Sequence, residues 1–168
     1  MLNKIEKLSE TEFVEVFANI FERASWIAEE LYERKPFENF QDLSKKMISI
    51  FENTNNQNKL KILNSHPDLA DKTKIGSLTL DSSREQSDAG LDQCSEKEFI
   101  EFKNLNVEYK SKFGFPFIVA IKGMSKSEIL DNFQKRTTHD KQAEFIEATI
   151  QVKKIASLRL EELKNKFA

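Results

Sequence analysis

The sequence predicts an all-α protein, folded as a single compact multi-helix domain over residues 1–168. Only four glycines and three prolines occur in the 168 residues. They fall between segments in which apolar residues recur every three or four positions. Serines followed three residues later by glutamate mark several segment starts, as in a capping box. A chain of this length buries enough surface to fold without a disulfide.

Three helices are expected in the first third of the chain. Ser9 and Glu12 have capping-box spacing and open the first helix. Its apolar stripe is Phe13, Val16 or Phe17, Ile20 and Phe21. A second helix is expected over about residues 25–33 and a third over about 39–52. One side of the third helix is apolar and should be buried: Leu43, Met47, Ile50 and Phe51.

His66 lies where a helix is forced to end. The run Lys59 to Leu63 predicts a short helix, and Pro67 disfavours the α conformation for the residue before it. The helix should therefore end at or just before His66. A helix C-terminus favours the imidazolium, so this ring is suited to proton transfer near neutral pH. The other interpretation is that His66 merely caps the helix.

A short helix of about two turns is expected around Ser82 and Glu85, ending near Gly90. Ser82 and Glu85 have capping-box spacing, which favours a purely structural role. Alternatively, the N–H groups at this helix start hold an anionic or carbonyl-rich ligand, and Glu85 and Gln86 reach it.

The second half of the chain predicts three longer helices. Ser95 with Glu98 opens a helix that ends near Gly114, and Ser125 with Glu128 opens another. The polar stretch 135–140 should separate this helix from the last one, over about residues 141–166. His139, in that stretch, looks like a solvated loop residue.

The segment 113–121 departs from the helical pattern. It consists of a helix stop at Gly114, a turn at Pro116 and a β-branched apolar run too short for a typical helix. We expect it to be buried. Its backbone N–H and C=O groups then need partners, either a bound ligand or loops and water.

Arg159 is in phase with the apolar stripe of the last helix. The stripe comprises Phe145, Ala148, Val152, Ile155 and Leu163. A guanidinium that points inward must meet a buried carboxylate or an anionic ligand, unless the side chain snorkels to the surface.

Composition excludes several classes of function. Lys and Arg number 26 against 28 Asp and Glu, so no strong field would hold nucleic acid or a membrane surface. The first residues lack the apolar core of a signal peptide, and no apolar run reaches membrane-spanning length. The single Cys94 excludes an intramolecular disulfide, so we expect a cytoplasmic protein. Two histidines and one cysteine without metal-ligand spacing predict no metal site.

Several motifs, in this order and spacing, resemble one known family. They are His66-Pro67-Asp68-Leu69-Ala70, Ser82-x-x-Glu85-Gln86 with Ala89-Gly90-Leu91, Asn104-x-x-x-x-Tyr109, Phe113-Gly114-Phe115-Pro116-Phe117, and, at the two ends, Arg34-Lys35-Pro36-Phe37 and Ile155-Ala156-x-Leu158-Arg159-Leu160. The chain resembles 2-oxo-4-hydroxy-4-carboxy-5-ureidoimidazoline (OHCU) decarboxylase over nearly its whole length. It departs at Ser25-Trp26, where the family usually has Ser-Pro-Trp, and at Asp71, where glycine is more usual.

The resemblance implies an all-helical, cofactor-free homodimer that converts OHCU to (S)-allantoin and carbon dioxide in urate breakdown. His66 would be catalytic, with Glu85 beside it. The pocket would be lined by Pro67, Ser82, Glu85 and Gln86, the backbone of Phe117, Ile118, Val119, Ala120 and Ile121 would bind the ring, and Arg159 would contact an anionic group. Whether His66 or Glu85 carries the proton stays open.

Two other functions fit the residues. In a non-catalytic helical binding or scaffold module, His66, Glu85 and Arg159 would be caps and salt bridges and need not converge on one cavity. In a hydrolase, His66 would act as general base, but the nearby serines resemble caps and no oxyanion turn is recognisable.

Overall fold

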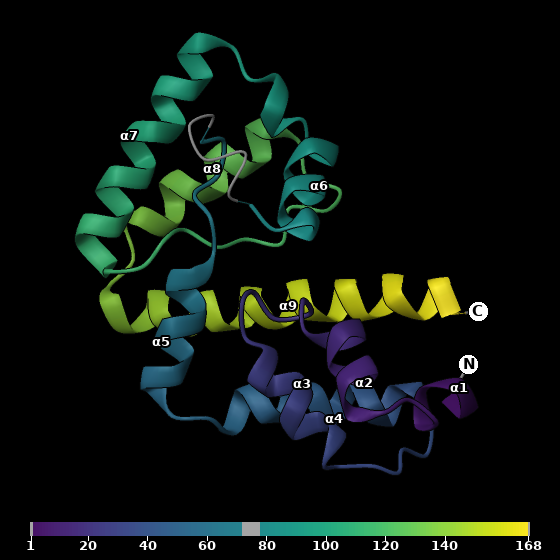
Figure 1. Cartoon of the computed structure of the whole chain (residues 1–168). Coiled ribbons are helices and arrows are strands. Elements are labelled where there is room, and N and C mark those ends of the chain that lie inside the picture. The colour runs from purple at the N-terminus through teal and green to yellow at the C-terminus, as the bar shows by residue number, and fades with distance from the viewer. Residues whose placement is uncertain (1, 72–77, 168) are drawn as a thin grey trace. The chain divides into compact units, whose positions relative to one another are not determined.

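The computed structural model describes residues 2–71 and 78–167, and within these ranges its regular structure is helical, without a strand. The prediction of an all-α fold is confirmed. Contacts between residues divide the chain into two compact units, residues 1–62 with 153–168 (unit 1) and residues 63–152 (unit 2). Figure 1 shows the helices of both units. A single domain over the whole chain stays a prediction.

Unit 1 combines helices from the two ends of the chain (Figure 1). They are α1 (Leu2–Glu6), α2 (Glu10–Phe17), α3 (Ser25–Tyr32), α4 (Phe40–Asn53), most of α5 (Asn56–Ser65) and the second half of α9 (Lys141–Phe167). Helix α3 packs against α2 and α4. The ring centroids of Phe21 and Phe51 lie 5.1 Å apart in its core. All four apolar residues predicted on one side of α4 are buried.

The first predicted helix proves shorter than its apolar stripe. Helix α2 has the predicted capping box at Ser9 but ends at Phe17. Ile20 and Phe21 follow it and are nevertheless buried. The N–H of Ile20 donates to the carbonyl of Phe17 at 3.2 Å, and that of Ala24 donates to Phe21 at 3.3 Å. Turns closed by hydrogen bonds between residues three apart bury apolar side chains at nearly the same spacing as an α-helix. The apolar stripe therefore continues past the end of α2, and the predicted helix was too long.

Unit 2 contains the helices of the middle of the chain (Figure 1). They are α6 (Leu80–Asp88), the 3₁₀ turn η2 (Leu91–Gln93), α7 (Glu96–Phe113), α8 (Lys126–Thr137) and the first half of α9. Its core gathers around the fully buried Tyr109. The rings that surround Tyr109, with centroids 4.5 to 5.9 Å from its own, are Phe113, Phe115, Phe117 and Phe133. No helix in the described ranges is long and apolar enough to cross a membrane.

Capping residues delimit α7 and α8 as predicted, with one exception. Both helices begin with the expected capping boxes, at Ser95 and Ser125, and α7 ends at Gly114 with φ of 81°. However, α8 continues through Thr137, so the first half of the polar stretch 135–140 is helical and only the second half connects α8 to α9. Arg136 and Thr137 are buried. A run of polar residues in the sequence does not indicate that two of them point inward.

Candidate active site

The backbone breaks at His66, as predicted. Helix α5 ends at Ser65, and the N–H of His66 donates to the carbonyl of Leu63 at 3.2 Å in a final turn. The His66 and Pro67 side chains are both half-buried. The imidazole therefore follows directly after a helix C-terminus, at the boundary between core and solvent.

Gln86 of α6 holds the residues that follow His66. Its side-chain Nε2 donates to the carbonyl of Asp68 at 3.2 Å, and its Oε1 accepts from the N–H of Ala70 at 3.1 Å. Ala70 has a φ of 55°, a conformation that an L residue rarely adopts without such support. One amide side chain thus fixes both sides of a strained turn.

Helix α7 holds the same turn from a second direction. Asn106 Nδ2 donates to the carbonyl of Leu69 at 3.0 Å. Lys110 Nζ lies 2.8 Å from Asp68 Oδ2 in a half-exposed ion pair. Because Asn106 and Lys110 are four residues apart, they lie on the same face of α7. The turn after His66 is therefore fixed by two helices.

Helix α6 starts three residues earlier than predicted. Its N-cap is Thr79, whose hydroxyl accepts from the N–H of Ser82, so a capping box from Ser82 to Glu85 is wrong. Both residues lie inside the helix instead. Ser82 and Gln86 are buried and Glu85 is half-buried. Their spacing of three and four residues places them on one inward face.

The segment 117–121 is non-helical and, apart from the half-buried Ala120, buried, as predicted, and two side chains bind its backbone. Arg136 Nη1 donates to the carbonyl of Ile118 at 2.6 Å. Gln151 Oε1 accepts from the N–H of Ala120 at 3.0 Å. These two backbone groups need neither a bound ligand nor water, because side chains of α8 and α9 are their hydrogen-bond partners.

Side chains of α7 also contact both backbone segments of the predicted site, the turn after His66 and residues 117–121. Asn106 and Lys110 bind the turn after His66, while Tyr109, between them in sequence, lies with its ring centroid 5.4 Å from that of Phe117. Both segments therefore lie against the same turn of α7. This proximity could not be inferred from residues about 50 positions apart in sequence.

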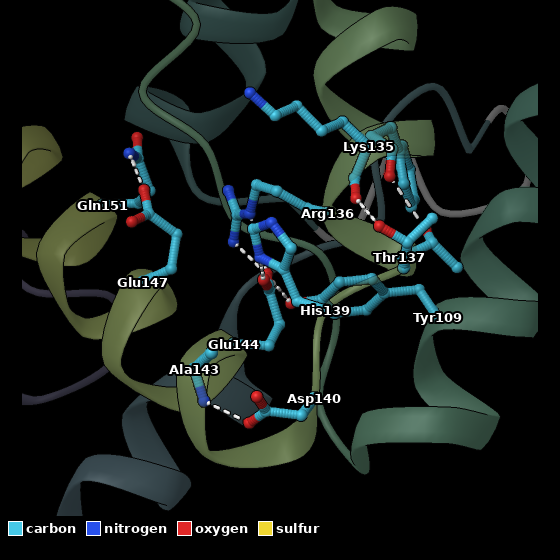
Figure 2. A network of polar contacts seen from close by, with 12 residues as sticks. Tyr109, Lys135, Arg136, Thr137, His139, Asp140, Ala143, Glu144, Glu147 and Gln151 are labelled. Carbon is cyan, nitrogen blue, oxygen red and sulfur yellow. Dashed lines mark hydrogen bonds and ion pairs between the residues drawn. The ribbon is translucent and has the colours of Figure 1, made fainter.

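A buried polar network that the sequence analysis missed lies beside this segment (Figure 2). The carboxylate of Glu144 is fully buried and accepts hydrogen bonds on Oε1 from Tyr109 Oη and from Nε and Nη2 of Arg136. Burial, reinforced by the bond to Glu144, raises the pKa of Tyr109, so its hydroxyl stays protonated and donates. The sequence did indicate that Glu144 points inward, because it lies four residues before Ala148 and so is in phase with the apolar stripe of the last helix, as Arg159 is.

His139 is not the solvated loop residue that we expected. Its Nδ1 lies 3.0 Å from Glu144 Oε2, and about a third of its side chain is exposed. His139 follows the end of α8, and the chain turns there toward α9 (Figure 2). His139 and Glu144 are only five residues apart, but they meet because the chain turns between α8 and α9.

Arg159 belongs to unit 1 and points inward, as its phase predicted. Its Nη1 lies 3.1 Å from Glu22 Oε2 and 3.0 Å from the carbonyl oxygen of Asn19, and both ionic side chains are buried. The guanidinium of Arg159 therefore meets a buried carboxylate, that of Glu22, which was one of the predicted alternatives. Its contact with an anionic ligand stays a prediction, as do the functional roles of the other site residues.

Two hollows lie in unit 2 next to the turn after His66. The larger has a volume of about 410 Å³ and runs along α7 beside Asp68, Asn106 and Lys110. The smaller, of about 130 Å³, lies beside Gln86. Both include Ala70, Asp71 and Phe99 in their walls. No group of three or more potential metal-ligating side chains occurs among the described residues.

The fold and site thus define an all-α protein in which one helix contacts both the turn after His66 and the buried non-helical segment around Phe117. The family model for OHCU decarboxylase matches residues 6–161. A 2-oxo-4-hydroxy-4-carboxy-5-ureidoimidazoline decarboxylase from Halalkalicoccus jeotgali is 35% identical over 162 residues, 96% of this chain and 89% of that protein. The chain belongs to the OHCU decarboxylase family.

A longer relative and a solved structure agree with this assignment. A uric acid degradation bifunctional protein from a Bacillus species is 36% identical over 162 residues; the match covers 96% of this chain but only 32% of that protein. The chain thus spans about a third of that relative's length. A crystal structure of OHCU decarboxylase in the presence of (S)-allantoin matches with a TM-score of 0.68 and 26% identity, over 83% of this chain and 91% of that one.

Proposed function

We propose that this chain is an OHCU decarboxylase, a carboxy-lyase that converts OHCU to (S)-allantoin and carbon dioxide in urate degradation. The observation that carries the proposal is the family match over residues 6–161, which includes every proposed site residue. The similarity to a decarboxylase from Halalkalicoccus jeotgali over 96% of this chain supports the same activity. The solved OHCU decarboxylase in the presence of (S)-allantoin supports the product.

The proposed reaction breaks the bond between the ring carbon and its carboxylate. Carbon dioxide leaves, the electron pair delocalises into the ring, whose carbonyl and imine-like nitrogen act as the electron sink, and a proton then adds to that carbon. Because the substrate supplies its own sink, we propose that the enzyme works without a cofactor. Its tasks are to orient the carboxylate, stabilise the developing charge and deliver the proton to one face.

We assign proton transfer to His66. The break in the backbone after Ser65 places the imidazole at the edge of the core, and Gln86 and Asn106 fix the turn that follows. This rigid support suits a group that must reach one face of the ring. Glu85, half-buried on the inward face of α6, would set the ionisation of His66 or hold the ureido and hydroxyl groups.

The remaining assignments concern binding. Pro67 and Ser82 would line the pocket, and Gln86 would shape it through the turn that it holds. The backbone of residues 117–121 would steady the ring oxygens, and Arg159 would contact an anionic group. We also propose a homodimer in the cytoplasm, and light scattering during size-exclusion chromatography would give twice the mass of one 19.5 kDa chain.

The decisive experiment follows the handedness of the product. OHCU is unstable and decays spontaneously to racemic allantoin, so product formation alone proves little. We would generate OHCU from urate with the two preceding enzymes, add this protein and record the circular dichroism of the allantoin. Rapid growth of an (S)-allantoin signal is expected. A racemic product formed at the uncatalysed rate by well-folded protein would overturn the proposal and favour a non-catalytic binding module.

A further inference from the structure

The buried carboxylate of Glu144 gathers polar side chains from two other helices and from the connection that precedes α9 (Figure 2). Tyr109 comes from α7, Arg136 from the last turn of α8, and Glu144 itself from the first turn of α9. Arg136 Nε lies 2.8 Å from Glu144 Oε1, and His139 Nδ1 lies 3.0 Å from Oε2 on the solvent side. A buried carboxylate needs such partners, because an unpaired one is very costly.

The same guanidinium reaches the non-helical segment 117–121. While Nε and Nη2 of Arg136 bind Glu144, Nη1 donates to the carbonyl of Ile118 at 2.6 Å. The guanidinium carbon also lies 4.5 Å from the centroid of the Phe117 ring. The planar fork of arginine permits these contacts together, whereas the single ammonium of lysine does not. Arg136 therefore orients two consecutive residues of the segment.

Gln151 of α9 binds the same segment at Ala120, two residues after Ile118. Its Oε1 accepts from the N–H of Ala120 at 3.0 Å, while its Nε2 donates to Glu147 at 2.7 Å (Figure 2). The segment belongs to no helix or sheet, so side chains must define its path. The Phe117 ring completes the support by stacking on Phe133, with centroids 3.9 Å apart.

We infer that Arg136, held in place by Glu144, is a positioning residue that fixes the backbone of residues 117–121 for substrate binding. This inference rests on the proposed function, in which that backbone binds the ring of OHCU. Arg136 acts through the segment and does not itself touch the substrate. Its loss should weaken binding more than it slows the proton transfer assigned to His66.

The test compares Arg136→Lys with wild-type protein. We expect kcat/KM for OHCU to fall about tenfold to a hundredfold, as misplaced binding groups cause, with most of the change in KM. Independently of activity, the backbone amide NMR signals of residues 117–121 should shift. Arg34→Lys is the matched control, because its partner Glu30 forms a largely exposed pair with it, and this variant should leave both readouts unchanged.

Glu144→Gln provides a second variant if Arg136→Lys fails to fold. It keeps the shape of the side chain but removes the charge that holds the guanidinium, so KM should rise in the same way. The two substitutions combined should be less than additive, because they act through one contact. Wild-type KM in a folded variant of either kind would overturn the inference while the proposed function stands. A wild-type chain that makes no (S)-allantoin would overturn the proposed function itself.

Discussion

Gln86 illustrates how a residue of a proposed site can stabilise the backbone beside it. The resemblance implied that it lines the pocket. In the structure its amide donates to the carbonyl of Asp68 and accepts from the N–H of Ala70. Only an amide can do both at once, because a carboxylate has no proton to donate near neutral pH. The side chain therefore stabilises the backbone turn next to His66.

Replacing Gln86 with alanine should destabilise the protein by about 1 to 3 kcal/mol, because it leaves the buried N–H of Ala70 without its partner. Urea unfolding followed by circular dichroism would measure the change. Gln134→Ala is the control, since Gln134 bonds Glu101 on the exposed surface of α8. We expect that control to change stability by less than about 0.5 kcal/mol. Equal effects of the two substitutions would contradict a structural role for Gln86.

Replacing His66 with asparagine should abolish formation of (S)-allantoin and leave the helical circular dichroism unchanged. Asparagine retains hydrogen-bonding groups but cannot gain and lose a proton near neutral pH. The stereospecific dichroism assay measures the first effect and the far-ultraviolet spectrum the second. A folded variant with a near-normal rate would remove His66 from the proposed mechanism.

At the scale of elements, capping residues explain which helix starts were predicted correctly. Ser9, Ser95 and Ser125 each have a glutamate three residues later, and each forms the expected capping box. Helix α6 differs because its cap is Thr79, which has no glutamate three residues later, whereas Ser82, which has one, lies inside the helix. The choice between them depends on where the backbone leaves the helical path, which local spacing does not determine.

The capping boxes should make stability sensitive to acid. The Lys126 ammonium, followed by the N–H and hydroxyl of Ser95, holds the pKa of Glu98 below its ordinary value of 4.5. The hydroxyl and N–H of Ser9 do the same for Glu12. Between the folded and unfolded pKa values the unfolded chain binds more protons, so stability rises with pH there. The contribution is complete above pH 4.5 and is lost as pH falls through the folded pKa.

Urea midpoints at pH 7, 4 and 3 would test this dependence. The wild-type midpoint should fall across the acidic range, and the midpoint of Glu98→Gln should fall less steeply, since its neutral amide does not titrate. Parallel curves for the two proteins would show that the capping box at Ser95 makes no contribution to acid sensitivity.

At the scale of the whole molecule, the chain corresponds to nearly all of some relatives and to part of others. The match covers 89% of the decarboxylase from Halalkalicoccus jeotgali but 32% of the bifunctional protein from a Bacillus species. The family therefore includes this fold both as most of a chain and as a portion of a longer one.

Binding of (S)-allantoin should raise the thermal unfolding midpoint of the whole protein. A ligand that binds only the folded state stabilises it by mass action, by about 2.7 kcal/mol at one hundred times its dissociation constant. Differential scanning fluorimetry with each enantiomer would measure the effect, with (R)-allantoin as the control. Equal shifts with both enantiomers, or none with either, would contradict a stereospecific site.

The sequence by itself determined the fold class, the starts of most helices, the break at His66 and the burial of residues 117–121. Each of these follows from local rules: apolar spacing, capping side chains and the restriction that proline places on its neighbour. The resemblance carried by its motifs also identified the family, which the match over residues 6–161 confirms.

Only the tertiary structure revealed which distant residues meet. Arg136 seemed part of a polar connection, yet it is buried against Glu144 and the carbonyl of Ile118. Gln86 and Asn106 converge on the turn after His66 from different helices. Such contacts satisfy buried polar groups, and their geometry depends on how helices pack. Sequence spacing can place a side chain on an inward face, but packing decides which partner it meets there.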